Sequence, residues 1–395
     1  MIAGVSVAIW LLGCDSERNR VLGNFIGLSP DGEEAVGCDW GVLVGGGRGN
    51  VIGGRSPAAA NVIAHTQWGA VRFSGGVGSE NRIEGNYLGM DPTGTRPLPQ
   101  ALGVVIGYEV TRRQIIGGDV PAAGNFIASG IGVMAENPGR GSLIWHNTFG
   151  AGPTGQELGI DVGVECHGSS PRVAENLFAV AAIGLAAHRR QSTPVVTGNE
   201  FRRCRNAIQI AKGAAPDLGD LNNASPEDNG RNVFSTANDY YVVNHSVRGI
   251  RAEGNGFGTT VVAEIAAKII DHEDNPAYGE VDFLPLLGAT GPASPAAGSP
   301  LLVSAACQPT GTEAAEVTVV LAAAAKVSIE VVNVAGRHVR WVAREVPVGA
   351  GLNRLAWDRR SDRGLVAPAG RYIIRVTARV PDGSQAQLLA PVMLR

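Results

Sequence analysis

The sequence is poor in aromatic and charged side chains, which make up 5% and 17% of its 395 residues. The formal net charge is −3 and no basic stripe dominates, so the composition gives no support to a nucleic-acid-binding surface. No apolar run of about 18 residues follows the N-terminal segment, and the sequence therefore predicts no transmembrane span.

Cysteine is also scarce, and its spacing matches no known motif. The five cysteines form no CxxC pair and no zinc-binding pattern. We expect them to be mostly buried apolar residues, with a single disulfide as the alternative. They are Cys14, Cys38, Cys166, Cys204 and Cys307.

Glycine, in contrast, is abundant, with 55 residues against a usual share of about 7%. Many of these glycines belong to repeats. NRVLGNFIG (Asn19–Gly27) recurs as NRIEGNYLG (Asn81–Gly89), and a weaker copy, SLIWHNTFG (Ser142–Gly150), follows. The long period contains shorter β-rich units of roughly 20–25 residues.

Such a unit has apolar residues at alternate positions, and it buries its apolar face only by stacking on its neighbours. Asn suits the corners because it tolerates the left-handed backbone conformation, and stacked Asn side chains hydrogen-bond from coil to coil. The repeats therefore predict an all-β chain whose first part is a solenoid of parallel strands, a right-handed β-helix.

The N-terminal segment MIAGVSVAIWLLGCDS allows two interpretations. It ends in a lipoprotein-like cleavage box, which would make it a signal and lipidate Cys14. Sliding it along the repeat, however, places Ile9 on Val71 and Leu11 on Phe73, and no Lys or Arg precedes the apolar run. We expect a β-strand. The chain would then begin inside a repeat, with an export signal further upstream.

The period changes after GNGFGTT (residues 254–260). Val261–Asp274 carries apolar residues at helical spacing, which predicts a helix capping the open end of a β-helix over residues 1–287. Residues 288–300 are rich in Gly, Ala, Ser and Pro and are expected to form a linker. The β-runs that follow predict a small antiparallel, immunoglobulin-like sandwich over residues 301–395.

Two family resemblances rest on these motifs. GNFIG, GNVIGG, ANVIA and GNYLG resemble the repeats of extracellular right-handed β-helix proteins of the pectin-lyase-like superfold. The tail is similar to the FlgD-like immunoglobulin domain found at the C-termini of secreted bacterial proteins, although Arg359 stands where that family usually has Gly. The residues shared with that domain are Ala335-Gly336-Arg337, Trp357-Asp358, Asp362, Gly364, Pro368, Gly370 and Tyr372.

The resemblances imply a protein of the extracellular space or cell surface of a bacterium, in which the sandwich is an attachment or sorting module. The superfold includes lyases, hydrolases and adhesins, so the fold does not decide the activity. The adjacent Asp-Asp pair of galacturonan hydrolases is absent, as are GxSxG, HExxH, P-loop and EF-hand motifs.

The best candidate for catalysis is GIDVGVECHG (Gly159–Gly168). Strand alternation would turn Val162, Val164 and Cys166 inward. The outer face would then hold Asp161, Gly163, Glu165 and His167, about 6.5–7 Å apart at each step. We predict Asp161, Glu165 and His167 as acid and base groups. Calcium ligation and an ordinary solvated strand face are the alternatives.

Other residues are candidates for substrate binding. Asp39, beside Trp40, occupies the position equivalent to Asp161 in the first repeat. Stacked coils would gather cations into a patch for anionic sugar acids, with ordinary surface cations as the alternative. That group comprises His188, Arg189, Arg190, Arg202, Arg203, Arg205 and Lys212. The predicted substrate-binding residues are Asp39, Trp40, Arg189, Arg190, Arg202 and Arg203.

Two aromatic groups are candidate sugar-stacking platforms, with packing as the alternative: Trp68 with Arg72, and Tyr240 with Tyr241. Together the features predict an exported protein that binds polysaccharide or another cell-envelope component. A lyase or hydrolase acting on an anionic glycan and a structural or adhesive stalk are the alternatives. Carboxylates and arginines do not recur as a ladder across coils, which favours binding or structure over catalysis. No cofactor is expected, except calcium if the protein is a lyase.

Overall fold

The computed structural model describes residues 1–395 except residues 33, 137–139, 224, 288–301, 310–313, 322–324, 334–336, 349–350, 380–384 and 395. The chain divides into two compact units. The first comprises Met1–Thr259 and Ile265–Asp282, and the second comprises Thr260–Glu264 and Phe283–Arg395. The predicted linker, residues 288–300, lies outside the described residues.

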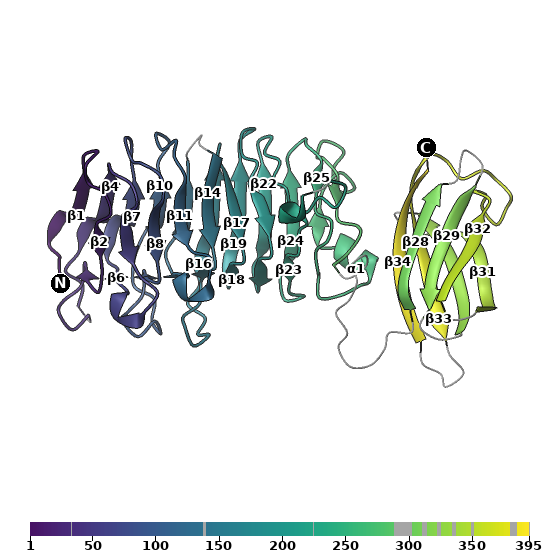
Figure 1. Ribbon diagram of the computed structural model, residues 1–395, viewed down its shortest axis with the longest axis horizontal. Helices are drawn as coiled ribbons and strands as arrows, with labels where there is room; N and C mark the ends of the chain where they lie inside the picture. The colour runs from purple at the N-terminus through teal and green to yellow at the C-terminus, as the bar shows by residue number, and fades with distance from the viewer. Residues whose placement is uncertain are drawn as a thin grey trace. The chain divides into compact units, whose positions relative to one another are not determined.

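Within the described residues of the first unit, parallel strands build three long sheets (Figure 1). The ten-stranded sheet contains β1 (Val5–Leu12), β4 (Cys38–Gly45), β7 (Thr66–Phe73), β10 (Leu102–Ile106), β13 (Ile131–Ala135), β16 (Ile160–His167), β19 (Ala181–His188), β22 (Asn206–Ala211), β24 (Tyr240–His245) and β26 (Ile269–Ile270). The seven-stranded sheet contains β2 (Arg20–Val21), β5 (Val51–Gly53), β8 (Asn81–Glu84), β11 (Gln114–Gly117), β14 (Arg140–Trp145), β17 (Ser170–Ala174) and β20 (Val195–Thr197). The eight-stranded sheet contains β3 (Phe25–Ile26), β6 (Val62–Ile63), β9 (Tyr87–Leu88), β12 (Phe126–Ile127), β15 (Thr148–Phe149), β18 (Leu177–Ala179), β21 (Glu200–Arg202) and β23 (Val233–Phe234).

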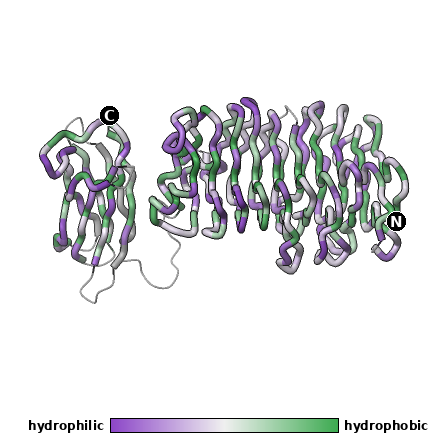
Figure 2. Tube along the Cα trace, turned by 180° about the vertical axis from the view of Figure 1, so that it is seen from behind, coloured by the Kyte–Doolittle hydropathy of each residue, from purple (hydrophilic) through white to green (hydrophobic). Residues whose placement is uncertain are grey.

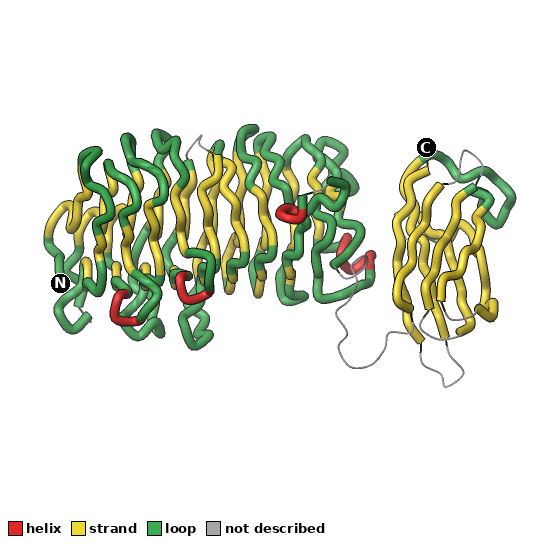
Figure 3. The backbone as a smooth tube through the Cα atoms, in the orientation of Figure 1, coloured by secondary structure: helices red, strands yellow, loops and turns green. Residues whose placement is uncertain are grey.

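Successive strands along the chain enter the three sheets in turn, so the chain winds as a parallel β-helix, as the repeats predict. Figure 3 shows the strands of each coil separated by turns. Hydrophobic and hydrophilic residues alternate along the coils in Figure 2, which is the pattern that turns one side of each strand toward the interior. A short parallel pair, β25 (Ile250–Arg251) and β27 (Val281–Asp282), follows the long sheets. Three short 3-10 helices lie in turns of the described chain: η1 (Pro57–Ala59), η2 (Pro121–Ala123) and η3 (Pro226–Asp228).

A ladder of asparagines follows the corner between the seven-stranded and eight-stranded sheets. Each side-chain amide donates a hydrogen bond to Oδ1 of the next asparagine, at 2.8–3.1 Å. The ladder comprises Asn24, Asn61, Asn86, Asn125, Asn147, Asn176, Asn199, Asn232 and Asn255. The predicted coil-to-coil hydrogen bonding of asparagines is confirmed.

The interior of the later coils contains a stack of phenylalanine rings. Their centroids are 4.8–5.1 Å apart and their planes are nearly parallel. The stack comprises Phe149, Phe178, Phe201, Phe234 and Phe257. Glycines of the ten-stranded sheet give these rings room, because a Cβ on Gly184 would lie 2.7 Å from Cδ1 of Phe201.

The N-terminal segment is a strand of the ten-stranded sheet, as the repeat alignment predicts. Ile9 of β1 pairs with Val42 of β4, and Val42 pairs with Val71 of β7. Val42 and Val71 are fully buried, whereas Ile9, on the first strand of the sheet, is half-buried.

The predicted capping helix is much shorter than Val261–Asp274. Helix α1 covers only Val262–Ala266, and Ile269–Ile270 forms β26, which pairs with Val242 and Val243 of β24. The extension of the helix to residue 274 is therefore wrong, because pairing to the sheet edge outweighs helical spacing in this apolar run. Among the described residues, no helix is long and apolar enough to cross a bilayer.

The second unit contains two antiparallel sheets, which fit a small sandwich. The three-stranded sheet contains β28 (Leu302–Pro309), β29 (Ala315–Leu321) and β32 (Gly351–Trp357). The four-stranded sheet contains β30 (Ala325–Asn333), β31 (His338–Val348), β33 (Gly370–Arg379) and β34 (Gln385–Leu394). Trp357 and Tyr372, from different sheets, meet edge to face in the core with ring centroids 5.7 Å apart. Arg359 has φ = 54°, a left-handed conformation that favours glycine. Ala335 and Gly336 lie outside the described residues.

All five cysteines are free thiols, so the disulfide alternative is wrong. Four of them are buried and Cys14 is exposed, which confirms the expectation that most are apolar fillers.

Candidate functional site

The outer face of the ten-stranded sheet carries most of the predicted site residues. In the second half of β16, alternation is as expected. Val164 and Cys166 are fully buried, and they alternate with the partly exposed Glu165 and His167. The side chains of Glu165 and His167 are 16% and 28% exposed. These two predicted residues therefore lie together on the outer face.

The first half of β16 departs from the expected alternation. A Cβ on Gly163 would lie 2.4 Å from Cδ1 of Phe178, so this position faces the interior, while Val162 is only half-buried. The prediction that Gly163 lies on the outer face is wrong. Asp161 is exposed and, at roughly 3.3 Å per residue, lies about 13 Å along the strand from Glu165. It does not join the cluster that Glu165 and His167 form.

The third member of that cluster is His188, which pairs with His167 across β16 and β19. Oε1 of Glu165 lies 2.7 Å from Nε2 of His167 and 3.5 Å from Nε2 of His188. The imidazole rings meet at 73° with centroids 5.3 Å apart. One potential ligand atom from each of the three side chains lies within 4.8 Å of the other two.

Burial lowers the pKa of His188, and the neighbouring His167, Lys212 and Arg189 add to the effect, while Glu165 opposes it. The sequence placed His188 in a basic group and missed its place beside Glu165. The signal was available in the repeat, because the distance from His167 to His188 is one short coil.

The predicted arginine patch is not one surface. Arg189 and Arg190 follow the last residue of β19 and are exposed. Arg202 lies instead beside the start of that strand, since its carbonyl accepts a hydrogen bond from the N–H of Val180. Eight strand residues, or about 26 Å, separate the two pairs. Arg202 is bound by Glu200 at 2.5 Å and Arg203 is paired with Glu157. The expectation that all four arginines stack into one patch is therefore wrong, and their role in binding stays a prediction.

A second group of residues occupies the outer face of β4 and β7. Trp40 is 9% exposed and packs edge-on against Trp68, with ring centroids 6.3 Å apart. The guanidinium of Arg72 lies 5.8 Å from the centre of the Trp40 ring and 3.4 Å from Glu109. Trp68 itself is 50% exposed. The solvent-facing aromatic surface therefore belongs to Trp68, while the buried ring of Trp40 packs against it.

The other candidate platform has a packing role for one of its two rings. Tyr241 is 1% exposed, and its hydroxyl donates to the carbonyl of Phe257 at 3.0 Å. Tyr240 is 37% exposed on the neighbouring position.

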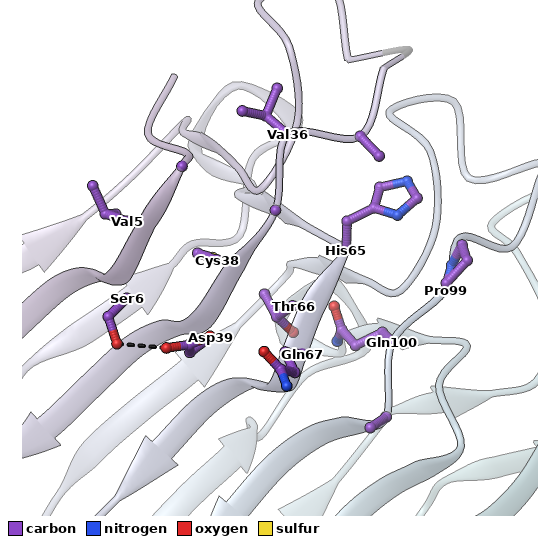
Figure 4. Close-up of a pocket in the computed structure, with 14 residues that line it drawn as sticks. Val5, Ser6, Val36, Cys38, Asp39, His65, Thr66, Gln67, Pro99 and Gln100 are labelled. Carbon is purple, nitrogen blue, oxygen red and sulfur yellow. Dashed lines mark hydrogen bonds between the residues drawn. The ribbon is translucent and has the colours of Figure 1, made fainter.

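An open pocket of about 780 Å³ lies at the start of β1, β4 and β7 (Figure 4). Gln67, the residue before Trp68 in the sequence, is part of its lining. Asp39 lines it and accepts a hydrogen bond from Ser6 at 2.6 Å. Gln100, also in the lining, is 8% exposed, and neither its Oε1 nor its Nε2 has a hydrogen-bond partner in the described structure. The same is true of the hydroxyl of Thr66. The lining of the pocket, which we call the Gln100 pocket, thus includes buried donors and acceptors without a partner in the described structure.

No protein-family model matches this chain, and no curated protein matches it.

Proposed function

We propose that the protein is an exported, surface-associated β-helix protein that binds polysaccharide on the outer face of its ten-stranded sheet, with the Gln100 pocket as one subsite. The observation that carries the proposal is the buried amide of Gln100, which has two polar atoms without partners at the pocket wall. An unpaired buried amide costs roughly 1–3 kcal/mol, and a sugar hydroxyl both donates and accepts.

The surroundings suit a sugar chain. Trp68 offers a half-exposed ring of the kind that packs on the apolar face of a sugar, and Gln67 and Asp39 add polar groups in the pocket lining. The ten strands stack at about 4.8 Å spacing, which makes a continuous face of roughly 43 Å. A face of that length fits a polymer better than a small molecule.

The assignment to the bacterial surface and the role of the sandwich rest on the resemblances. The repeat motifs resemble extracellular β-helix proteins, and the tail is similar to a domain of secreted bacterial proteins. On this proposal the sandwich attaches or sorts the protein, while the β-helix engages the glycan.

A second candidate function is cleavage of an anionic glycan by a lyase or hydrolase mechanism. The hydrogen bond between Glu165 and His167 favours it, because a carboxylate that orients an imidazole is a common arrangement for a general base. Asp161 lies too far along the strand to act with them on one bond.

The test is binding of the full chain to a panel of neutral and anionic polysaccharides, measured by affinity electrophoresis and calorimetry. Trp68→Ala is expected to weaken binding about 2- to 10-fold, since ring stacking contributes roughly 0.5–1.5 kcal/mol. Gln100→Ala is expected to weaken it by a similar factor, since a hydrogen bond contributes about 0.5–1.5 kcal/mol. Tyr108→Ala removes another exposed ring, outside the pocket lining, and should leave binding unchanged.

Absorbance of unsaturated ends and a reducing-end assay on the same panel detect cleavage. Activity that disappears in Glu165→Gln would establish the second candidate. Failure to bind or cleave any polysaccharide would overturn both candidate functions and leave the structural or adhesive stalk as the remaining alternative.

A further inference from the structure

The outer face also contains a histidine–carboxylate cluster that lies away from the Gln100 pocket, on β16 and β19. We propose that Glu165, His167 and His188 form a binding site for a divalent transition-metal ion of the zinc type. The proposal does not depend on glycan binding, because none of the three residues lines the Gln100 pocket.

The spacing of the three side chains suits one ion. A tetrahedral zinc ion with bonds of about 2.0–2.2 Å holds its ligand atoms roughly 3.4 Å apart. Oε1 of Glu165 lies 2.7 and 3.5 Å from the two Nε2 atoms, and all three ligand atoms lie within 4.8 Å of one another. Small rotations of the side chains bring the three atoms to that geometry.

The donor set selects the class of metal. Two imidazoles and one carboxylate are the protein ligands of many catalytic zinc sites, which leave a fourth position open to water. Calcium requires six to eight oxygen ligands, and this cluster offers one carboxylate. The calcium site expected if the protein is a lyase is therefore not formed by these residues.

The backbone holds the ligands in place. His167 and His188 are adjacent partners on neighbouring parallel strands, and the buried side chains of Cys166 and Ala187 anchor both strand ends. The ligand side chains are between 16% and 28% exposed, so one side of the cluster is open to a fourth ligand.

The local charges also bear on a cation. Lys212 and Arg189 lie near His188, and their positive charge opposes a metal ion. The carboxylate of Glu165, which lies beside both imidazoles, counters that charge.

The experiment uses the metal-stripped full chain, titrated with ZnCl2 by calorimetry and with CoCl2 by visible absorption. We expect one equivalent of Zn2+ and a Co2+ spectrum of low coordination number. His167→Ala and His188→Ala should each weaken affinity more than 100-fold, since even the loss of a supporting partner costs about 10–100-fold. Ca2+ should not compete.

Alanine at position 188 fits the fold, because Ala211 is the partner of His188 on the next strand. The matched control is His245→Ala, which removes an exposed histidine paired with Ala211 on its other side. It should bind Zn2+ like the wild type. Absence of saturable Zn2+ binding, or equal affinity in the His188→Ala and His245→Ala variants, would overturn the site. Trp68→Ala, which tests glycan binding, should leave Zn2+ binding unchanged, so failure of one proposal is distinguishable from failure of the other.

Discussion

Asn147 and Asn176 are joined through a single oxygen. Oδ1 of Asn176 accepts the backbone N–H of Asn147 at 2.8 Å and the side-chain amide of Asn147 at 3.1 Å. Both residues are at most 2% exposed. The same pair of hydrogen bonds recurs at each step of the ladder, so each asparagine satisfies buried backbone and side-chain donors of the preceding coil.

Asn176→Ala should destabilise the β-helix by roughly 3 kcal/mol. The substitution leaves the buried N–H of Asn147 without its acceptor, and each such group costs about 1–3 kcal/mol. Urea unfolding followed by circular dichroism measures the change. Asn24→Ala is the matched control, because Asn24 is only half-buried at the start of the ladder. It should cost less than about 1 kcal/mol, and equal losses in the two variants would show that the ladder bonds are not the cause.

Gly184→Ala should lower the stability of the later coils by about 1–3 kcal/mol, the usual penalty for overpacking a filled core. A Cβ there would lie 2.6 Å from the carbonyl oxygen of Ala207 and 2.7 Å from the ring of Phe201. Thermal unfolding detects the change. At Gly249 the nearest atom to a new Cβ is 3.7 Å away, so Gly249→Ala should have the same melting temperature as the wild type. An unchanged melting temperature for Gly184→Ala would contradict the packing argument.

The repeat spacing was sufficient to predict the β-helix, the asparagine contacts and the strand character of Val5–Leu12, because each follows from residues that recur at equivalent positions of neighbouring coils. The sequence was insufficient where one strand departs from strict alternation. Gly163 faces the interior, where the ring of Phe178 occupies the space that a side chain would need. That contact lies between two sheets, and a period of two residues contains no information about it.

The candidate site was predicted only in part for a related reason. Glu165 and His167 lie on one strand, so alternation alone predicted their common face. His188 and the arginines lie on another coil, where their position depends on the length of each turn. The same limit applies to Ile269 and Ile270, whose short apolar run fits a helix as well as a strand until the sheet edge is known.

The histidine of the sandwich should titrate above its usual range. His338 lies between two carboxylates, with Nε2 2.7 Å from Asp362 and Nδ1 2.8 Å from Glu330. The hydrogen bond with Asp362, followed by that with Glu330, raises the pKa of His338 above 6.5. Arg340 pairs with Asp362 and Arg375 with Glu330, so both carboxylates also interact with a positive charge.

Because the pKa of His338 is raised in the folded state, its contribution to stability is complete below pH 6.5 and disappears as pH rises through the folded value. Proton NMR of the imidazole measures that pKa in the full chain. Asp362→Asn should move it toward 6.5, while Asp358→Asn, which removes a carboxylate that pairs with Arg340, should move it less. A wild-type pKa at or below 6.5 would contradict the prediction.

Thiol labelling should distinguish Cys14 from the other cysteines. Burial raises the pKa of Cys38 to about 11 and the pKa values of Cys166, Cys204 and Cys307 to about 12. Because the thiolate is the reactive form, these four should remain protonated and unlabelled at pH 8, whereas Cys14 is exposed. A chromogenic disulfide reagent should therefore label one thiol per native chain and all five after unfolding in guanidinium. Cys14→Ser should abolish the native label, and rapid labelling that persists in this variant would show that a buried thiol opens to solvent.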